Sequence, residues 1–272
     1  MNIVDKNEVK WTVFDHFSEE DGLVHGFSTR IGGVSAAPYS TLNLAFHVGD
    51  EPEDVIENRK KFCEALGIDI NDLTAGEQVH GDKIRLVTGE DRGSGAFDYQ
   101  TAFSCTDGFI TNQPGVVLSS YYADCVPLFI YDPVHRAVAL AHAGWKGTVK
   151  RIGAKTIRAM GERFDTRAED CLVGIGPSIG GCCYQVDEYV IDPFKKEFDF
   201  IEEVTQDEGE GHWLLDLPAA NRHIFRETGV PAENIEMSQF CTSCRTDLFY
   251  SYRAENGDTG RMASIIMLKP SI

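Results

Sequence analysis

Two histidines and one cysteine in this sequence have the residue types and local settings of a metal site or an acid–base site. His142 ends a run of small apolar residues, Cys125 opens a second apolar run, and His80 stands directly before a glycine. Two imidazoles and one thiolate make a three-ligand zinc set with an open fourth position, which is the arrangement of catalytic zinc sites. A cysteine facing a histidine is also the pair that thiol catalysis requires.

A β-hairpin is expected to bring Cys125 and His142 together. Two apolar runs flank Asp132–His135, and Pro133 suits the second position of a type I turn within a four-residue loop. If the hairpin is symmetric and has no bulge, this loop places Cys125 directly opposite His142 on the same face. Directly opposed side chains have Cβ atoms about 4.5 to 5.5 Å apart, so a thiolate and an imidazole could share one metal ion or one proton.

His80 and Pro127 leave two points of this arrangement open. The separation of His80 from Cys125 along the chain gives no information on whether their side chains are close in space. A lone histidine in a loop more often faces solvent. Pro127 has no backbone N–H, which indicates that its strand is irregular or lies at the edge of a sheet. A single bulge there would remove the alignment of Cys125 with His142.

The segment after His142 is typical of a turn from a strand into a helix. It reads Ala143-Gly-Trp-Lys-Gly147, and we expect a helix from Thr148 onward. Such a turn exposes backbone N–H groups at a helix N-terminus, where anions bind, and Lys146 adds a positive charge. Many glycine turns only change the direction of the chain, but a cysteine and a histidine beside this one favour a binding site.

The charge of the chain excludes several classes of partner. Of 272 residues, 25 are Lys or Arg and 43 are Asp or Glu, and the formal net charge of −18 makes nucleic acids and anionic membranes poor partners. A small anion can still bind through a few local donors. The sequence has no apolar run long enough to span a membrane, and it does not begin with the pattern of a signal peptide. We therefore expect a cytoplasmic protein.

Strands and helices are interleaved along the whole chain, so a single domain over residues 1–272 with mixed α and β structure is expected. The expected strands are 23–28, 84–87, 108–111, 116–122, 126–132, 136–142, 171–175, 213–216 and 263–268. The expected helices are 52–66, 148–164, 187–198 and 218–228. The first has Pro52 at its start, acids in its first turn and Gly67 at its end. The acidic stretch 205–211 is expected to be a loop.

Four further cysteines form short motifs. Cys241 and Cys244 make a C-x-x-C pair, which by itself suggests a redox pair or half of a zinc site. No second C-x-x-C completes a set of four sulfur ligands, although Cys182 and Cys183 could contribute. In a reducing compartment disulfides are not expected. We interpret Cys241 and Cys244 as buried thiols without a role. Cys182 and Cys183 follow Gly180 and Gly181, where the backbone could approach a substrate or simply another strand.

Four motifs together resemble a known family. They are HGD at 80–82, ADCVP at 123–127, HAGWKGT at 142–148 and GPSIGGCCYQV at 176–186. They resemble the bacterial laccase-domain family, formerly called polyphenol oxidases, whose members are described as multifunctional purine nucleoside enzymes. The segments 27–35, 43–50, 57–59 and 249–264 are also similar to the family, so the resemblance covers essentially the whole chain.

The resemblance implies a fold, a metal and a set of reactions. The implied fold is an α+β, single-domain, four-layer α-β-β-α sandwich with mixed sheets. The implied cofactor is a zinc ion held by His80, Cys125 and His142. The implied reactions are phosphorolysis of adenosine, inosine and S-methyl-5'-thioadenosine to the free base and (methylthio)ribose 1-phosphate, and deamination of adenosine. Purine nucleosides and phosphate are thus the expected partners, while the sequence leaves a monomer or a homodimer open.

These reactions need groups beyond the metal ligands. Deamination uses a water activated by zinc and a carboxylate that shuttles protons, and phosphorolysis needs a site for an anion and stabilisation of the leaving purine. The carboxylates nearest in sequence are Asp124, Asp82 and Glu77. Candidate phosphate donors are Lys146, Arg30 and Arg59, and candidate partners of the nucleoside are Asn43 and Gln78. Arg59 could equally be a solvated helix residue, and Asn43 a cap or turn residue.

Other functions stay open as alternatives. A cysteine hydrolase or amidase would use Cys125 as nucleophile and His142 or His80 as base. A copper-dependent polyphenol oxidase is disfavoured, because none of the eight histidines forms a His-x-His pair and no methionine lies near these motifs as an axial ligand. Copper is possible at a His₂Cys site but would be adventitious. A scaffold role gives no reason for a cysteine, a histidine and a glycine turn to converge.

Overall fold

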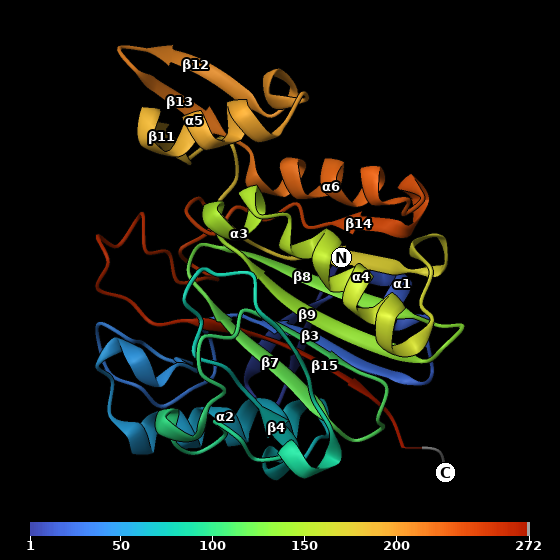
Figure 1. Ribbon diagram of the computed structural model, residues 1–272. Coiled ribbons are helices and arrows are strands. Elements are labelled where there is room, and N and C mark those ends of the chain that lie inside the picture. The colour runs from blue at the N-terminus through green and yellow to red at the C-terminus, as the bar shows by residue number, and fades with distance from the viewer. Residues whose placement is uncertain (271–272) are drawn as a thin grey trace.

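The computed structural model describes residues 1–270, which form a mixed α/β fold with three sheets and six α-helices (Figure 1). The strands are β1 (Asn2–Lys6), β2 (Val9–Val13), β3 (Leu23–Ser28), β4 (Leu73–Thr74), β5 (Ile84–Leu86), β6 (Gly108–Thr111), β7 (Val117–Tyr122), β8 (Val126–Asp132), β9 (Ala137–Ala143), β10 (Leu172–Ile175), β11 (Gln185–Asp187), β12 (Thr205–Gly209), β13 (His212–Leu215), β14 (Ile235–Met237) and β15 (Met262–Leu268). The helices are α1 (Asp15–Ser18), α2 (Pro52–Leu66), α3 (Trp145–Val149), α4 (Ile152–Phe164), α5 (Glu188–Glu197) and α6 (Leu217–Thr228). The expected mixture of α and β structure is confirmed.

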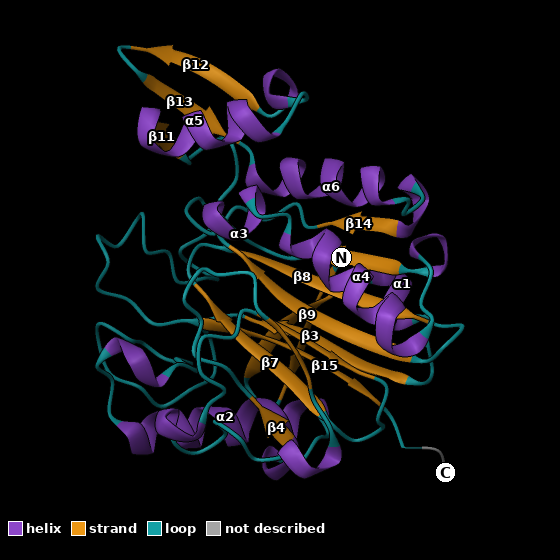
Figure 2. Ribbon diagram, in the orientation of Figure 1, coloured by secondary structure: helices purple, strands orange, loops and turns teal. Residues whose placement is uncertain are grey.

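Two mixed sheets of six strands form the centre of the molecule. Their strand orders are β1-β2-β3-β15-β7-β4 and β14-β10-β8-β9-β6-β5. Most neighbours are antiparallel, and the pairs β4–β7, β5–β6 and β10–β14 are parallel. A small third sheet, β11-β13-β12, stands with α5 at the top of the view, apart from the two large sheets (Figure 2).

The strands β8 and β9 divide their side chains between two apolar cores, because successive residues of a strand point to opposite faces. Leu128 and Ile130 pack in a cluster with residues of α4 and α6, whereas Phe129 and Leu140 pack in a second cluster between the two large sheets. A third cluster joins the other face of the first sheet to α2. Figure 1 accordingly shows α4 and α6 outside one sheet and α2 outside the other.

Most local signals in the sequence are confirmed. All nine expected strands are present with ends within one residue of the expectation, and α2 has Pro52 in its first turn and Gly67 in the left-handed region at its end, with φ 74°. The helix expected over 148–164 is wrong as one element. It is two helices, α3 and α4, because Arg151 takes a left-handed conformation with φ 57° and breaks the chain direction between them. No helix within residues 1–270 combines the length and the apolar content needed to cross a membrane.

The loop of the hairpin lies one residue further along the chain than expected. The loop consists of residues 133–136, because Asp132 stays in β8 and Arg136 takes a left-handed φ of 49°. His142 therefore pairs with Pro127, and Cys125 lies just before β8 rather than directly opposite His142. Moving the whole loop by one residue changes each pairing by two positions, so the face of the sheet is unchanged. Cys125 and His142 lie on the same face as diagonal neighbours.

Two further expectations are corrected by the sheets. The strand with Pro127 is not an edge strand, because β8 lies between β10 and β9, and Pro127 is tolerated near its first residue, where the ladder with β10 ends. The stretch 205–211 is not only a loop, because Thr205–Gly209 forms the edge strand β12. Its polar, exposed side chains carry no apolar alternation that would indicate a strand.

Candidate active site

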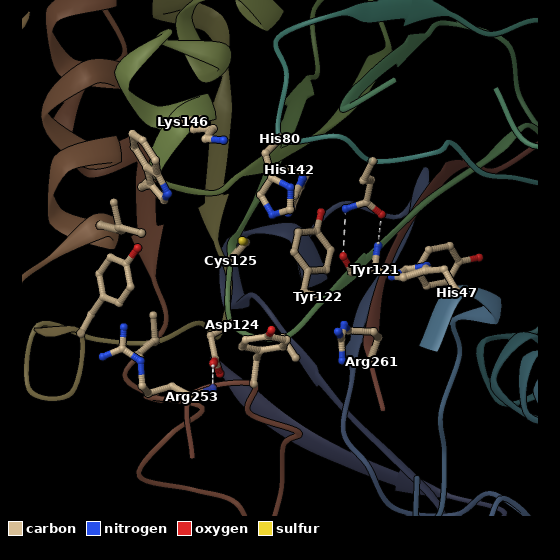
Figure 3. A pocket seen from close by; sticks show the side chains of 17 residues that line it. His47, His80, Tyr121, Tyr122, Asp124, Cys125, His142, Lys146, Arg253 and Arg261 are labelled. Atoms are coloured by element: carbon tan, nitrogen blue, oxygen red, sulfur yellow. Dashed lines mark hydrogen bonds between the residues drawn. The ribbon is translucent and has the colours of Figure 1, made fainter. Parts of the chain in front are cut away.

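His80, Cys125 and His142 meet at one end of the core between the two large sheets (Figure 3). One ligand atom from each residue lies within 4.8 Å of the other two, and the two imidazole rings are 4.9 Å apart between centroids. His142 comes from β9, Cys125 precedes β8, and His80 comes from the loop between β4 and β5. The expected convergence of the three side chains is present, and the set has the donors of a three-ligand zinc site.

Asp107 holds two of these three residues in place. Its carboxylate lies 2.8 Å from Nδ1 of His142 and accepts backbone N–H groups from Val79, His80 and Gly81. With Nδ1–H donated to a carboxylate, the Nε2 lone pair of His142 is free for a metal or a proton. The same buried carboxylate orders the turn that carries His80, whose φ of 58° is left-handed.

Electrostatics at the site favour the thiolate form of Cys125. Burial raises the pKa of the Cys125 thiol, but the adjacent His142 and His80 outweigh burial and lower that pKa overall. Burial lowers the pKa of His142, but Cys125 and Asp107 outweigh it and raise that pKa. Because the thiolate is the form that binds metals and attacks carbon, the site is prepared for either role.

Gly144 allows the three side chains to come together. A Cβ atom at this position would lie 2.9 Å from Sγ of Cys125 and 2.8 Å from Cδ2 of His80, closer than side-chain carbons approach other atoms. The backbone of the turn after β9 therefore closes against the cluster, and any larger residue would displace Cys125 or His80. The glycine turn therefore serves the site through the close approach at Gly144. Its helix N-terminus contributes little to anion binding, because α3 has only five residues and a small helix dipole.

The three residues lie in the wall of a cavity of about 610 Å³. This volume falls within the range of about 300 to 1,000 Å³ that is usual for small-molecule sites. The aromatic residues of the lining include Tyr122, Trp145, Tyr184 and Tyr252. The cations of the lining are Lys146, Arg253 and Arg261. The cavity therefore combines π surfaces, positive charge and three clustered side chains of types that can bind a metal.

The residues expected to bind substrate divide into two groups. Lys146 and Gln78 line the cavity, although the amide of Gln78 is used in two hydrogen bonds with the backbone of Tyr121. Arg30, Arg59 and Asn43 do not line it.

The positions of these three outlying residues have plain structural reasons. Arg59 is buried and donates to the carbonyls of Leu44, Gly95 and Ala96. Arg30 donates to backbone carbonyls and pairs with Glu255 at 2.9 Å. Asn43 is buried, and its Oδ1 accepts the backbone N–H of Arg261. The direct substrate contacts predicted for them have no support in the geometry.

The structure ranks the three candidate carboxylates. Asp124 lines the cavity next to Cys125. Its oxygens accept hydrogen bonds from the Thr242 hydroxyl at 2.6 Å and from the backbone N–H of Arg253 at 2.9 Å. Burial raises the pKa of Asp124 above its ordinary value. Asp82 instead pairs with Lys150 and Lys155.

The third carboxylate, Glu77, is also engaged elsewhere. It accepts a hydrogen bond from the backbone N–H of Cys105 and does not line the cavity. Asp124 is therefore the carboxylate best placed to exchange protons with a bound molecule.

The sequence interpretation missed several residues of the site. Asp107 precedes an expected strand without any motif of its own, so only its contacts reveal it. His47, Arg253 and Arg261 lie in the cavity lining. They occur within 43–50 and 249–264, two segments similar to the family, and that signal could have marked them. Burial lowers the pKa of His47 to about 4, helped by Arg261, so its imidazole is neutral near pH 7.

Comparisons with known proteins agree over nearly the whole chain. The family model described as "Multi-copper polyphenol oxidoreductase laccase" matches residues 24–269. The purine nucleoside phosphorylase YlmD of Bacillus subtilis is 40% identical over 247 residues, which cover 91% of this chain and 89% of the relative. The adenosine deaminase RL5 of an unknown prokaryotic organism is 34% identical over 240 residues, which cover 88% and 91%.

Solved structures agree with the fold. The crystal structure of YlmD from Geobacillus stearothermophilus matches with a TM-score of 0.93 at 37% identity and covers 98% of both chains. The crystal structure of the hypothetical protein YfiH of Bacillus licheniformis also matches with a TM-score of 0.93, at 39% identity, and covers 98% of this chain and 99% of that one.

Proposed function

The chain belongs to the multi-copper polyphenol oxidoreductase laccase family, and from this premise we propose that it is a zinc-dependent enzyme of purine nucleosides. It cleaves adenosine, inosine and S-methyl-5'-thioadenosine with phosphate, and it also deaminates adenosine. Support comes from relatives named purine nucleoside phosphorylase and adenosine deaminase, which are at least 34% identical over most of their length.

The cluster of His80, Cys125 and His142 in the wall of the cavity carries this proposal. Its donor set suits zinc, Asp107 presents Nε2 of His142, and Gly144 leaves room for the three side chains to converge. A zinc ion held by these three residues would supply Lewis-acid activation of a water molecule or of a leaving group.

Arg261 is the proposed phosphate-binding residue. Its Nη1 donates to the carbonyls of Thr259 and Gly260, and the side chain lies in the lining of the cavity. These carbonyls are neutral, so the positive charge of this half-buried guanidinium can still be balanced by an anion that binds beside it. A phosphate oxygen held there attacks the anomeric carbon, the bond from this carbon to the purine nitrogen breaks, and the purine leaves with the electron pair. Lys146 adds a second positive charge to the same cavity.

Asp124 is the proposed proton carrier of deamination. Each of its oxygens accepts one hydrogen bond and keeps a free lone pair, so either oxygen can accept a proton from the attacking water. The same carboxyl then returns the proton to the amino group, which leaves C6 of the purine as ammonia. The rings of Trp145 and Tyr184 in the lining offer faces on which the purine can stack.

The decisive experiment incubates the purified protein with adenosine, inosine or methylthioadenosine, with and without phosphate, and separates the products. We expect free base and the sugar 1-phosphate only with phosphate, and some inosine from adenosine without it. Cys105→Ser, which changes an exposed cysteine outside the cavity, serves as the control and should keep full activity. Zinc-loaded protein that turns over none of the three nucleosides would overturn the proposal, as would full activity in Cys125→Ala.

One observation favours a second candidate. Cys125 lies beside His142, and His142 contacts Asp107. This is the arrangement of a nucleophile, its base and the carboxylate that orients the base. A cysteine hydrolase would trap an acyl group on Cys125 in metal-free protein, whereas the nucleoside enzyme would lose its activity when the metal is removed. The names of the relatives favour the nucleoside enzyme.

A further inference from the structure

Four cysteines that are distant in sequence gather at a second place in the structure. Cys182 and Cys183 lie in the loop between β10 and β11, and Cys241 and Cys244 lie in the loop after β14. The four Sγ atoms all lie within 4.8 Å of one another. Sγ of Cys244 is 3.3 Å from that of Cys183 and 3.6 Å from that of Cys182.

These separations match four sulfur atoms around one ion. A disulfide joins its sulfur atoms at about 2.05 Å. A tetrahedral zinc site with Zn–S bonds of about 2.3 Å places its sulfur atoms about 3.8 Å apart. Simple burial of thiols does not explain the cluster either, because Cys182 and Cys244 are exposed and the other two are half-buried. The expectation that Cys241 and Cys244 are buried is therefore wrong.

The backbone holds the two loops in register at the cluster. Ser178 and Cys241 form a parallel β-bridge, and the N–H of Thr242 donates to the carbonyl of Ser178. The N–H of Gly180 donates to Sγ of Cys241 at 3.3 Å, a contact that favours the negatively charged thiolate. The sulfur atoms are thus positioned before any ion binds, which reduces the ordering that binding requires.

We propose that these four cysteines bind one zinc ion, in a structural site separate from the nucleoside site. Four thiolates in a tetrahedral arrangement suit zinc or iron, and a closed set of four ligands is the pattern of structural zinc sites. Neither the residues of this cluster nor its ion takes part in the activity proposed above, so the two proposals stand or fall separately.

The site joins two loops that both contribute residues to the lining of the cavity. The first loop carries Ile179, whose N–H donates to the carbonyl of Asp124, and the second carries Thr242, whose hydroxyl donates to the Asp124 carboxylate. Arg253, further along the second loop, donates from Nη1 to the carbonyl of Gln185 at the start of β11, where the first loop ends. Zinc in the cluster fixes Asp124 beside Cys125 by holding both loops together.

The test measures zinc per chain in protein purified without chelators. The Cys125→Ala background removes the contribution of the nucleoside site, and this protein should hold one zinc per chain. Adding Cys182→Ser or Cys244→Ser should reduce this content to none, whereas adding Cys105→Ser, an exposed cysteine outside the cluster, should leave it at one. Circular dichroism of each variant verifies that the fold is retained.

Cobalt provides a readout that does not depend on activity. When Co²⁺ replaces zinc in the Cys125→Ala protein, thiolate-to-metal charge-transfer absorption should appear and should be lost in the Cys244→Ser variant. Three results would overturn the assignment: Cys125→Ala protein that holds no zinc, iron in place of zinc, or a disulfide between two of the four cysteines in protein isolated under reducing conditions.

Discussion

The carboxylate of Asp107 lies 2.8 Å from Nδ1 of His142 and at the same time binds the turn that carries His80. One buried acid therefore orients the ring of His142 on β9 and fixes the backbone that carries His80, in a loop far away in sequence. Partners of this kind fix the tautomer and the ring orientation of a ligating histidine. The geometry of the cluster therefore depends on a residue that is not one of its three members.

Asp107→Asn should weaken metal binding without removing a ligand. The amide is neutral and cannot serve His142 and the three backbone N–H groups equally well, so we expect metal affinity to fall about 10- to 100-fold. Competition with a chelator of known affinity measures this change, and nucleoside turnover should fall with it.

Asp132→Asn is the matched control for this variant. Asp132 is equally buried and lies 2.8 Å from Nδ1 of His135, but this pair caps the hairpin loop at the opposite end of β8. It should lower the free energy of unfolding and leave metal affinity unchanged. An equal loss of metal in both variants would mean that Asp107 acts only on general stability.

Gly144→Ala should disrupt the cluster by one methyl group. The added Cβ would lie within 3 Å of both Cys125 and His80, so one of the two side chains must move. A displacement of about 1 Å at a reacting centre can cost about 100-fold in rate. We expect a loss of this order in kcat/KM. Gly22→Ala is the control, because its Cβ meets only the tip of Arg136 at 3.8 Å and should leave kcat/KM unchanged.

Arg261→Gln should separate the two proposed reactions. Losing a charged hydrogen-bond donor to phosphate costs about 1.5 to 3 kcal/mol, so the KM for phosphate should rise about 10- to 100-fold. Deamination, which uses no phosphate, should change little, and Arg261→Lys should restore part of the phosphate affinity. Equal losses in phosphorolysis and deamination would show that Arg261 binds the nucleoside or supports the fold instead.

His25 should make stability depend on pH in the acidic range. Its Nε2 accepts the N–H of Phe14 at 2.9 Å, and burial lowers its pKa from 6.5 to about 3, with a smaller contribution from His16. The unfolded chain binds the proton more readily, so this contribution is complete above about pH 6.5 and is lost as pH falls toward 3. It amounts to on the order of 5 kcal/mol. Urea unfolding at several pH values should show a shallower pH dependence for His25→Gln than for the unmodified chain. Parallel curves would contradict this assignment.

Local sequence patterns predicted much of the fold. The strands 23–28, 108–111 and 126–132 have the expected bounds because apolar runs between turn residues leave little choice of structure. Cys125 and His142 share a face because the parity of a hairpin survives a shift of its loop. The edge strands β1 and β12 were not predicted, because their side chains are mostly exposed and the strands form by pairing with a neighbour.

The sequence by itself determined the chemical types of the site: the Cys125–His142 face, the glycine turn and the motifs that relate the chain to its family. Only the tertiary structure decided that Asp107 joins the cluster, that Arg261 rather than Arg59 faces the cavity, and that four cysteines from two loops meet. These contacts join segments from different strands and loops, and side-chain periodicity acts only within one element. Their positions follow from how the sheets pack, which no local pattern encodes.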